Sequence, residues 1–552
     1  CEFFNIVTDS GSTFSIKNDI YVLGNWTNLG IFDAQGHTVF FTGNSSDSSV
    51  TAGSSHFSGF VVKKDISVND SVVIDGAAVF YKGVKSLSSG NFVFNGSVDC
   101  KTDVTLGCGF SFGTGSSFSA PAGNLYLKGN SDFSGCGSFS HNDGTIYFHG
   151  FTPADVRTLT TKDSQEFYNL NISGSVNLEL NGAVKARKFQ LSDEARGYTS
   201  TYTTELTGSG SLAAEEIVLT KCSSLSDASN SACLVLNADL TSNKKIKTEN
   251  GVSIEIKSGK TLKAASLVHE TSQSTPFSEI RVYGTLDVTD AASAGDGTIQ
   301  LSEKSGGSGG IKLSVFSGGS VKSKKITVQG NFSNGSDSAV ISNAGTIEVS
   351  DEISIKSDGS GSENVLELLD GFQLSGSGTL KIDSSILKYS GTSAASSDFS
   401  VELLGNTGKP VKIVSDSAKI TFGNVSYIDE PELSVRGKSA LSATSGGTVS
   451  KLTTETEDTV FYPGGNFTVS GETWLYGKVE ASGASDELCF RGNIVSKSGT
   501  AAVKALTVYA GKASASPLDL VKVSGSPSGC ALKIDCNFEN YADFVIEDSI
   551  KL

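Results

Sequence analysis

The stretch GNWTNLGIFDAQGHTVFFTG, residues 24–43, indicates how the chain folds. It predicts a short polar and aromatic strand, a Gly, a second strand that starts near Ile31, a Gly turn, and a third strand through Val39 to Phe41. The theme recurs in altered form as FSGCGSFSHNDGTIYFHGF, residues 133–151, followed by QEFYNLNISGS, residues 165–175. One strand-and-turn unit cannot bury its apolar side alone, so its repetition predicts that successive units stack.

Composition favours one repetitive all-β body over a series of ordinary domains. The chain has 552 residues with 62 Gly, only 8 Pro and no Met, and 38% of its residues are hydrophobic, which is enough for a core. Short strands separated by Gly, Ser, Asn and Asp turns dominate the pattern. Only GSLAAEEIVLTK (210–221) and SENVLELLDGF (362–372) have a spacing that predicts short helices.

Two kinds of repeat divide the chain. Residues 1–190 are rich in aromatic side chains, and 19 of the 31 Phe precede residue 170. Residues 191–245 break the pattern and are interpreted as an irregular junction or insertion. Residues 246–552 carry a leaner repeat in which Gly supplies the turn, Thr the strand entry, and two aliphatic residues point to one face. Its copies are GTLDV at 284, GTIQL at 297, GTIEV at 345 and GTLKI at 378, with an early relative, GTIYF, at 144.

The charge distribution argues against a nucleic-acid partner. The formal net charge is −16, spread thinly with no basic block, whereas phosphate binding requires clustered Lys and Arg.

No apolar run approaches the roughly 18 to 20 residues of a membrane-spanning segment. A stack of strands also has open sheet edges at its ends, which must be capped or used for assembly, so self-association is one expected property.

The nine cysteines favour disulfides over a metal site. No Cys-x-x-Cys pair occurs and there are only five His, so neither a zinc site nor any other metal or cofactor is expected. Each close pair is a candidate disulfide that would indicate an oxidising compartment, and the alternative is that the thiols are buried and free. The candidate pairs are Cys100 with Cys108, Cys222 with Cys233, and Cys530 with Cys536, which leaves Cys136 and Cys489 unassigned.

The first residue, Cys1, suggests a lipid attachment site of the bacterial lipoprotein kind. Removing it from the count would leave an even number of cysteines. Strand pattern begins at once in EFFNIVTDSGSTFSI, without the polar tether expected after an anchor, so a disulfide or a cut chain end is the alternative. Any contact with a membrane is expected only through such a lipid.

The repeats resemble those of large bacterial surface proteins. In that family a Gly-Asn-Trp-Thr-Asn strand precedes a Gly-Thr-Val-x-Phe-x-Gly element and then Phe-x-Asn-Leu-x-Ile. The last element corresponds here to Phe167, Asn169, Leu170 and Ile172. Such proteins are similar to the secreted right-handed parallel β-helices of adhesins and autotransporter passengers. The resemblance covers about residues 20–190, implies an extracellular β-solenoid, and carries no active site.

A catalytic alternative has weaker support in the sequence. Some β-helices are polysaccharide lyases or hydrolases that use clustered carboxylates with Lys or Arg. The best local candidate is Asp429, Glu430 and Glu432 in YIDEPEL, where a solvated loop is the simpler interpretation. His141 and His149 with Cys136 are more simply turn and surface residues than metal ligands.

These observations predict a secreted or cell-surface structural or adhesive β-solenoid that is not an enzyme and has no catalytic residues. It would present side-chain rows and loops to a host or cell-surface glycan or protein, or stack with copies of itself. The alternative function is that of a carbohydrate-active β-helix enzyme. Trp26 and Trp474, the only tryptophans, lie in strand patterns where packing is the expected role.

Overall fold

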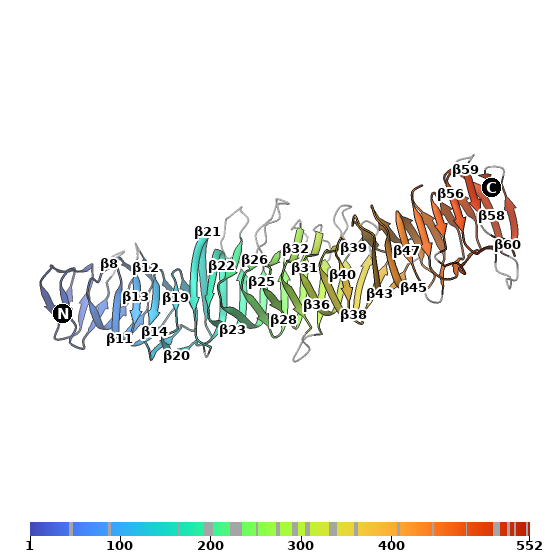
Figure 1. Cartoon of the computed structure of the whole chain (residues 1–552). Coiled ribbons are helices and arrows are strands. Elements are labelled where there is room, and N and C mark those ends of the chain that lie inside the picture. The colour runs from blue at the N-terminus through green and yellow to red at the C-terminus, as the bar shows by residue number, and fades with distance from the viewer. Residues whose placement is uncertain are drawn as a thin grey trace. The chain divides into compact units, whose positions relative to one another are not determined.

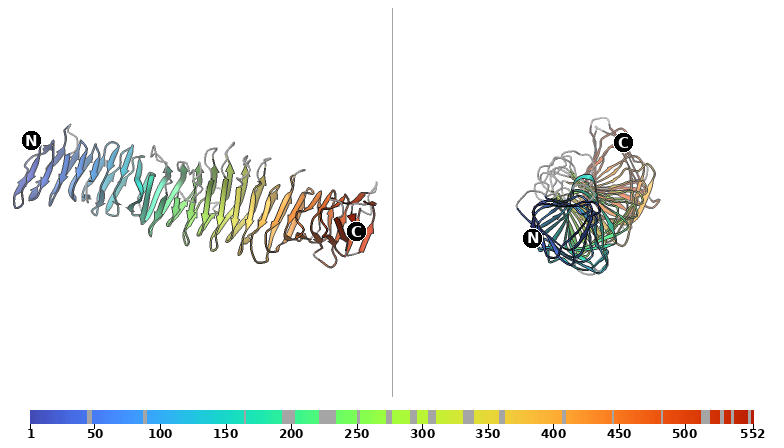
Figure 2. Two further views of the ribbon diagram at one scale, coloured as in Figure 1. Left: turned by 90° about the horizontal axis from the view of Figure 1, so that it is seen from above. Right: turned by 90° about the vertical axis from the view of Figure 1, so that its left-hand side faces the viewer.

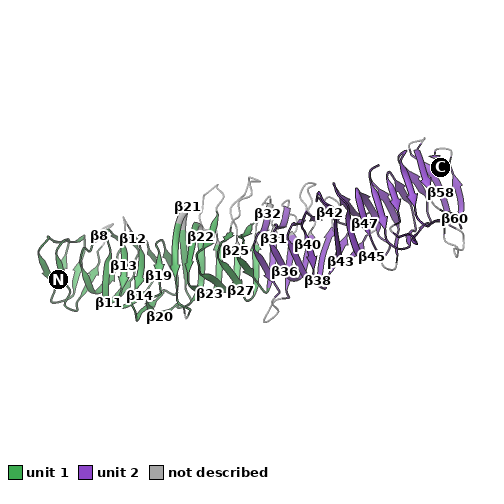
Figure 3. Ribbon diagram, in the orientation of Figure 1, with its two compact units in different colours: residues 1–265 green, residues 266–552 purple. Residues whose placement is uncertain are grey.

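The structure is a computed structural model. It describes residues 1–43, 48–86, 90–163, 165–192, 203–220, 234–249, 252–271, 277–289, 296–303, 310–330, 339–357, 363–405, 409–443, 446–481, 483–511, 519–526, 530–534, 537–547 and 550–552. Two compact units divide the chain, unit 1 at Cys1–Ala265 and unit 2 at Ser266–Leu552 (Figure 3).

Residues 24–43 form one turn of a parallel β-helix. It contains β5 (Trp26–Asn28), β6 (Ile31–Asp33) and β7 (Thr38–Phe41), at the predicted positions. Each of the three strands pairs in parallel with a strand of a neighbouring turn: β5 with β2, β6 with β3, and β7 with β4. Three parallel ladders therefore run through unit 1, and Figures 1 and 2 show their strands side by side in successive turns.

The strands of unit 1 belong to these three ladders, and several long strands bend from one ladder into the next. The first ladder begins with β1 (Glu2–Phe3), β4 (Ile20–Val22), β7, β9 (His56–Val62), β11 (Val72–Phe80), β14 (Ser97–Cys100), β17 (Ser116–Ser119) and β20 (Cys136–Ser140). The second contains β2 (Ile6–Thr8), β5, β8 (Ser48–Thr51), β10 (Ile66–Val68), β12 (Val84–Ser86), β15 (Val104–Leu106), β18 (Asn124–Leu127), β21 (Thr145–Thr160), β22 (Glu166–Asn181), β23 (Ala183–Ser192), β25 (Ser211–Thr220) and β28 (Lys245–Glu249). The third uses β3 (Thr13–Ser15), β6, β13 (Asn91–Phe94), β16 (Gly109–Phe112), β19 (Ser131–Asp132), β24 (Thr204–Thr207), β26 (Leu234–Leu236) and β29 (Ile254–Ile256). In addition, β27 (Asp239–Ser242) pairs with the first half of β25, and β30 (Thr261–Lys263) pairs with β27.

Unit 2 repeats the arrangement. Its first ladder contains β33 (Thr285–Val288), β36 (Ser320–Gly330), β38 (Thr346–Ser357), β40 (Gln373–Ser375), β43 (Ala395–Leu404), β45 (Ile420–Ile428), β47 (Lys438–Leu441), β50 (Val460–Pro463), β53 (Lys478–Glu480), β56 (Ala501–Lys504), β59 (Cys530–Ile534) and β62 (Ile550–Lys551). The second contains β31 (Ser266–Thr271), β34 (Thr298–Glu303), β41 (Thr379–Asp383), and the separate run β48 (Gly447–Val449), β51 (Phe467–Val469), β54 (Glu487–Phe490), β57 (Thr507–Ala510) and β60 (Asn537–Asn540). The third contains β32 (Phe277–Val282), β35 (Gly310–Val315), β37 (Ala339–Asn343), β39 (Val365–Leu368), β42 (Ile386–Tyr389), β44 (Val411–Ser415), β46 (Glu432–Arg436), β49 (Lys451–Thr454), β52 (Thr473–Leu475), β55 (Ile494–Ser496), β58 (Leu520–Gly525) and β61 (Asp543–Ile546).

The Gly-Thr-Leu/Ile repeat works as predicted. Its Thr is the first residue of a strand in every copy: Thr145, Thr285, Thr298, Thr346 and Thr379. The two apolar residues that alternate after it point inward in each case, because successive side chains of a strand face opposite ways. The predicted all-β parallel β-helix is confirmed.

The core of unit 1 is aromatic. The Trp26 ring is fully buried, and its centroid lies 4.8 Å from that of Phe32 and 5.3 Å from that of Phe57. Ring-to-ring contacts of this kind continue through successive turns as far as Phe167. Each fully buried Phe stabilises the fold by about 1.5 to 3 kcal/mol relative to an exposed one.

The core of unit 2 is aliphatic. Equivalent inward positions of neighbouring turns stack Leu, Ile and Val on one another, as in the row Leu366, Leu387, Ile413 and Val435. Leu366 and Leu387 are 21 positions apart (387 − 366), within the range that one turn of a β-helix requires. The change from aromatic to aliphatic repeats in the sequence is therefore a change in what fills the interior.

Gly96, which ends the motif NFVFNG, is required by close backbone packing. A Cβ at this position would lie 1.9 Å from the carbonyl oxygen of Gly76, one turn earlier. The motif therefore ends in Gly because two turns of backbone approach each other there.

Both predicted helices are wrong, and no helix occurs among the described residues. Residues 211–220 form β25, in which Leu212, Ala214, Ile217 and Leu219 point inward. Residues 365–368 form β39, in which Leu366 and Leu368 point inward. Cross-strand pairing with adjacent turns overrides the helical propensity of Ala, Glu and Leu.

The described residues between 191 and 245 continue the ladders. β24 pairs with β26, and β25 pairs with β23 and β27, all in parallel. The expectation of an irregular junction rested on the polar segment 193–210 and the stretch after it; residues 204–207 of that segment form β24, whereas 193–202 and the later segment 221–233 lie outside the described residues.

Candidate functional site

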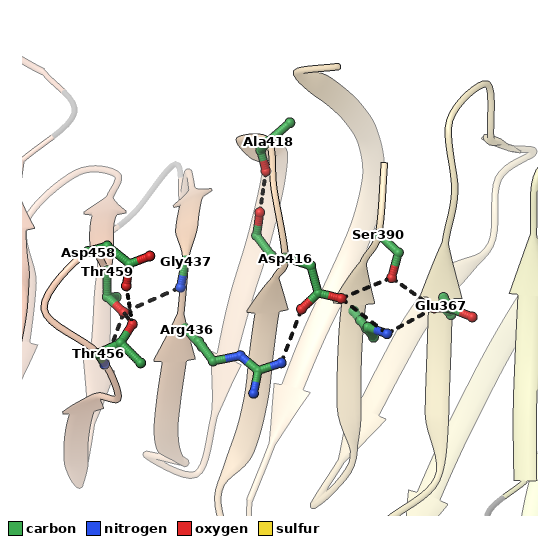
Figure 4. A network of polar contacts seen from close by, with 11 residues as sticks. Glu367, Ser390, Asp416, Ala418, Arg436, Gly437, Thr456, Asp458 and Thr459 are labelled. Carbon is green, nitrogen blue, oxygen red and sulfur yellow. Dashed lines mark hydrogen bonds and ion pairs between the residues drawn. The ribbon is translucent and has the colours of Figure 1, made fainter. Parts of the chain in front are cut away.

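A row of charged side chains crosses the outward face of the third ladder of unit 2 (Figure 4). The alternation of each strand that turns Leu366, Leu387 and Val435 inward turns Glu367, Lys388 and Arg436 outward. Asp416, directly after β44, completes the row. We call these four residues, from four successive turns, the charged row.

The charged row alternates in sign and is fully connected. Lys388 Nζ lies 3.1 Å from Glu367 Oε1 and 3.2 Å from Asp416 Oδ2. Arg436 Nη2 lies 3.1 Å from Asp416 Oδ1. The Ser390 hydroxyl is 2.8 Å from Glu367 Oε1 and 3.3 Å from Asp416 Oδ2, so it can donate to either carboxylate.

Both carboxylates of the row are held ionised. Burial opposes the ionisation of Glu367, but hydrogen bonds from Ser390 and Lys388 outweigh it and lower the pKa. Burial acts in the same way on Asp416, and Lys388 with Arg436 brings its pKa below the usual value. Burial depresses the pKa of Lys388, but the two carboxylates outweigh that effect and raise it.

This electrostatic arrangement suits a cross-strand ladder better than acid–base chemistry. A general acid at neutral pH needs a raised carboxyl pKa, whereas Glu367 and Asp416 both have lowered ones. Opposite charges on neighbouring strands stabilise their register by about 0.2 to 1 kcal/mol a pair.

A polar corner lies beside the Arg436 end of the charged row (Figure 4). The Thr459 hydroxyl, which is fully buried, accepts a hydrogen bond of 3.3 Å from the Gly437 amide and lies 2.8 Å from the Thr456 hydroxyl. Gly437 has a φ of +78°, and a Cβ there would lie 1.9 Å from the Ser415 carbonyl oxygen. The corner that follows Arg436 is therefore fixed by backbone geometry and side-chain hydrogen bonds together.

A second charged row lies on the second ladder of unit 2, to which β36, β38 and β43 contribute their later halves by pairing with β34 and β41. The Glu352 carboxylate lies 3.1 Å from Lys325 Nζ and 2.9 Å from Lys381 Nζ, and Lys381 Nζ lies 3.8 Å from the Glu402 carboxylate. Burial opposes the ionisation of Glu352, but the two lysines outweigh it and lower the pKa. Unit 2 thus carries alternating charges on more than one outward face.

The acidic cluster proposed from the sequence forms a turn and a strand start. Asp429 and Glu430 have φ values of 56° and 49°, the left-handed conformation of a tight corner. Glu430 Oε2 accepts a hydrogen bond of 2.7 Å from the Ser470 hydroxyl, and Glu432 begins β46.

The His and Cys residues considered as a metal site take separate roles. His141 Nδ1 accepts a hydrogen bond of 3.0 Å from the Asp143 amide, and its ring lies 5.4 Å from that of Tyr168. His149 lies within β21, and the Cys136 Sγ is 3.0 Å from the Ser138 carbonyl oxygen. Among the described residues no three His, Cys, Asp or Glu are grouped as metal ligands would be.

The disulfide predicted between Cys100 and Cys108 is wrong, because both are free thiols. Both side chains occupy inward positions and act as small apolar core residues, with 3% and 2% of their surface exposed. Burial raises the pKa of the Cys100 thiol and raises that of Cys108 to about 12. Cys530 is also a buried free thiol, so the disulfide predicted between Cys530 and Cys536 is wrong as well.

The other cysteine predictions remain as they were. Cys222, Cys233 and Cys536 lie outside the described residues, so the Cys222–Cys233 disulfide stays a prediction. Cys489 is half-buried, with its Sγ 3.3 Å from the Gly511 carbonyl oxygen. Cys1, the proposed lipid attachment site, is exposed.

The two tryptophans differ in environment. Trp26 packs in the core of unit 1, as predicted. Trp474 faces outward on β52 and is half-buried beneath two lysines, with Lys451 Nζ 4.1 Å and Lys497 Nζ 4.6 Å from its ring centroid. Its packing is therefore a cation–π arrangement on the surface.

Sequence reasoning missed both charged rows, although each leaves a weak signal. Glu367 and Lys388 occupy the same place in the pattern apolar-charged-apolar of two consecutive strands, 21 positions apart. Asp416 follows Lys388 by 28 positions (416 − 388), and Arg436 follows Asp416 by 20 (436 − 416). Unequal turn lengths hide the alignment.

The fold and these outward rows define a parallel β-helix of the solenoid class. No protein-family model, curated protein or solved structure matches the chain. The described part of the chain contains no helix long and apolar enough to cross a membrane.

Proposed function

We propose that this protein is an extracellular structural or adhesive scaffold of the bacterial cell surface. The observation that carries the proposal is the regular three-ladder stack of each unit, which places outward side chains from successive turns in rows. Such rows form extended faces of repeated chemistry, of the kind that solenoid proteins use for binding or assembly. The resemblance of residues 20–190 to bacterial surface repeats supports the same location.

Self-assembly through the faces of the solenoid is the first form of this function to test. Alternating charges let one face dock on a second copy shifted by one turn, so that Lys381 meets a carboxylate such as Glu402 of another molecule. Contacts of this type are screened by salt, because the Debye length falls from about 30 Å at 0.01 M to about 3 Å at 1 M.

Electron microscopy of the purified chain at low and high salt tests the proposal. We expect filaments or sheets at low salt that dissociate in concentrated salt. Lys381→Glu, which reverses the centre of the second charged row, should reduce assembly strongly. Lys82→Glu, at an exposed position of unit 1, is the matched charge control and should leave assembly unchanged.

A carbohydrate-active enzyme is the alternative function. The charged row supplies the specific observation in its favour, since it combines two carboxylates with Lys388 and Arg436 on one face. Incubation with a panel of acidic and neutral polysaccharides distinguishes the two. Depolymerisation by the wild type that Asp416→Asn abolishes would refute the scaffold proposal, whereas filaments without cleavage support it.

A further inference from the structure

A surface depression of about 390 Å³ lies on the first ladder of unit 2. It spans β53, β56 and β59, three strands in successive turns that pair in parallel. Its volume falls at the lower end of the range, about 300 to 1,000 Å³, that is typical of small-molecule sites.

The depression follows from one small side chain in a row of long ones. The register places Ala502 between Lys478 on one neighbouring strand and Lys533 on the other. In the adjacent outward row Glu480 lies opposite Lys504. Because Ala502 ends at its Cβ, the surface drops there while the long side chains form the walls.

The walls of the depression are positively charged. Three lysines and one glutamate line it, in a protein whose formal net charge is −16. Outward lysines of the charged rows, such as Lys381 and Lys388, are paired with carboxylates. Within the described part of the chain, by contrast, no carboxylate lies within ion-pair distance of Lys478 or Lys504. Two cations without such a partner beside a hollow are suited to an anionic ligand.

The remaining polar groups of the depression further restrict the chemical class of ligand that would fit it. Glu480 is an acceptor that needs a donor, and the Thr500 hydroxyl can both donate and accept. A simple anion would satisfy the lysines and be repelled by Glu480. A sugar-sized molecule that carries an anionic group and several hydroxyls would satisfy all of them.

We propose that this depression binds an anionic sugar unit, with its acidic group between Lys478, Lys504 and Lys533 and a hydroxyl donating to Glu480. Ala502 forms the floor against which the ring lies. This proposal is independent of the self-assembly proposed above. It concerns binding of a ligand by one molecule, whereas assembly concerns association between copies, so a negative result for one proposal does not refute the other.

Saturation-transfer NMR with the full chain tests the site, with D-glucuronate and D-glucose observed directly and inorganic phosphate, which has no carbon-bound proton, added as a competitor against D-glucuronate. D-Glucuronate should bind, and D-glucose should bind at least about tenfold more weakly because it lacks the charge. Phosphate should also bind more weakly than D-glucuronate, because it offers Glu480 no polyol. Equal binding of glucose, equal binding of phosphate, or no binding of glucuronate would each overturn the proposal.

Matched variants locate the binding. Lys504→Glu should weaken D-glucuronate binding by about tenfold or more, whereas Lys438→Glu, on β47 of the same ladder but outside the depression, should change it less than about twofold. Ala502→Leu should fill the floor and abolish binding, whereas Thr421→Leu, at an outward position of β45, should preserve it. Thermal unfolding of all four variants confirms that they are folded. Equal effects within either pair would place binding elsewhere and refute the site.

Discussion

His269 should make unit 2 sensitive to mild acid. Its side chain on β31 is fully buried, and its Nε2 lies 2.6 Å from the hydroxyl of Ser278 on β32, which is also fully buried. Burial lowers the pKa of His269 from 6.5 to about 4, because the interior disfavours the imidazolium. The folded protein therefore holds this imidazole neutral.

The sign and size of the effect follow from linkage. Between pH 6.5 and 4 the unfolded chain binds a proton at this position and the folded chain does not, so stability falls as the pH falls. The loss is complete below about pH 4. A shift of 2.5 units (6.5 − 4) at about 1.4 kcal/mol per unit corresponds to about 3 kcal/mol.

Hydrogen exchange of the β31 and β32 amides at several pH values measures this loss as a local opening free energy. His269→Gln keeps a hydrogen-bonding group but cannot titrate. Between pH 7 and 4 the opening free energy of the wild type should therefore fall by about 3 kcal/mol more than that of the variant. His56→Gln, at an exposed position, controls for the loss of a histidine as such. Parallel pH profiles for the wild type and His269→Gln would refute the reasoning.

Three further predictions follow from packing and charge. Gly96→Ala should lower the free energy of unfolding by about 1 to 3 kcal/mol because its Cβ meets backbone, whereas Gly499→Ala, with nothing within 4 Å of the added Cβ, should be neutral in the same thermal melts. Lys388→Met should lower the free energy of unfolding by about 1 kcal/mol at neutral pH and low salt. This loss should shrink in 1 M salt, and also as the pH falls through the lowered pKa values of the two carboxylates that Lys388 contacts. A loss that does not depend on salt would contradict the ion-pair role. In the native protein a maleimide should label Cys1, which is exposed, and spare Cys108 until denaturant is added, as peptide mass spectrometry would show; rapid labelling of Cys108 would contradict its burial.

Local motifs predicted the strands because each strand depends on a short pattern. The turn at residues 24–43 and the Thr that opens each Gly-Thr-Leu/Ile copy needed only alternation and turn chemistry. Residues 211–220 were predicted wrongly because Leu212, Ala214, Ile217 and Leu219 suit an inward-facing strand once adjacent turns pair with it, and that pairing is not a local property.

The candidate sites depend on pairing between turns and could not be derived from the sequence. Glu367, Lys388 and Asp416 meet only after turns of different length are stacked. The depression over Ala502 requires the register of three strands. Cys100 and Cys108 were assigned to a disulfide by proximity in sequence, but Cys100 at the end of β14 and Cys108 between β15 and β16 are both buried as free thiols.

The two tryptophans give each unit its own optical reporter. Trp26 is enclosed by Phe rings in unit 1, while Trp474 lies within cation–π distance of two lysine ammonium groups on the surface of unit 2. Replacing Trp474 by Phe leaves a chain whose indole fluorescence follows unit 1 alone, and replacing Trp26 by Phe isolates unit 2. Comparing the two unfolding curves would reveal whether the aromatic and aliphatic interiors melt together or in sequence, without adding an external dye.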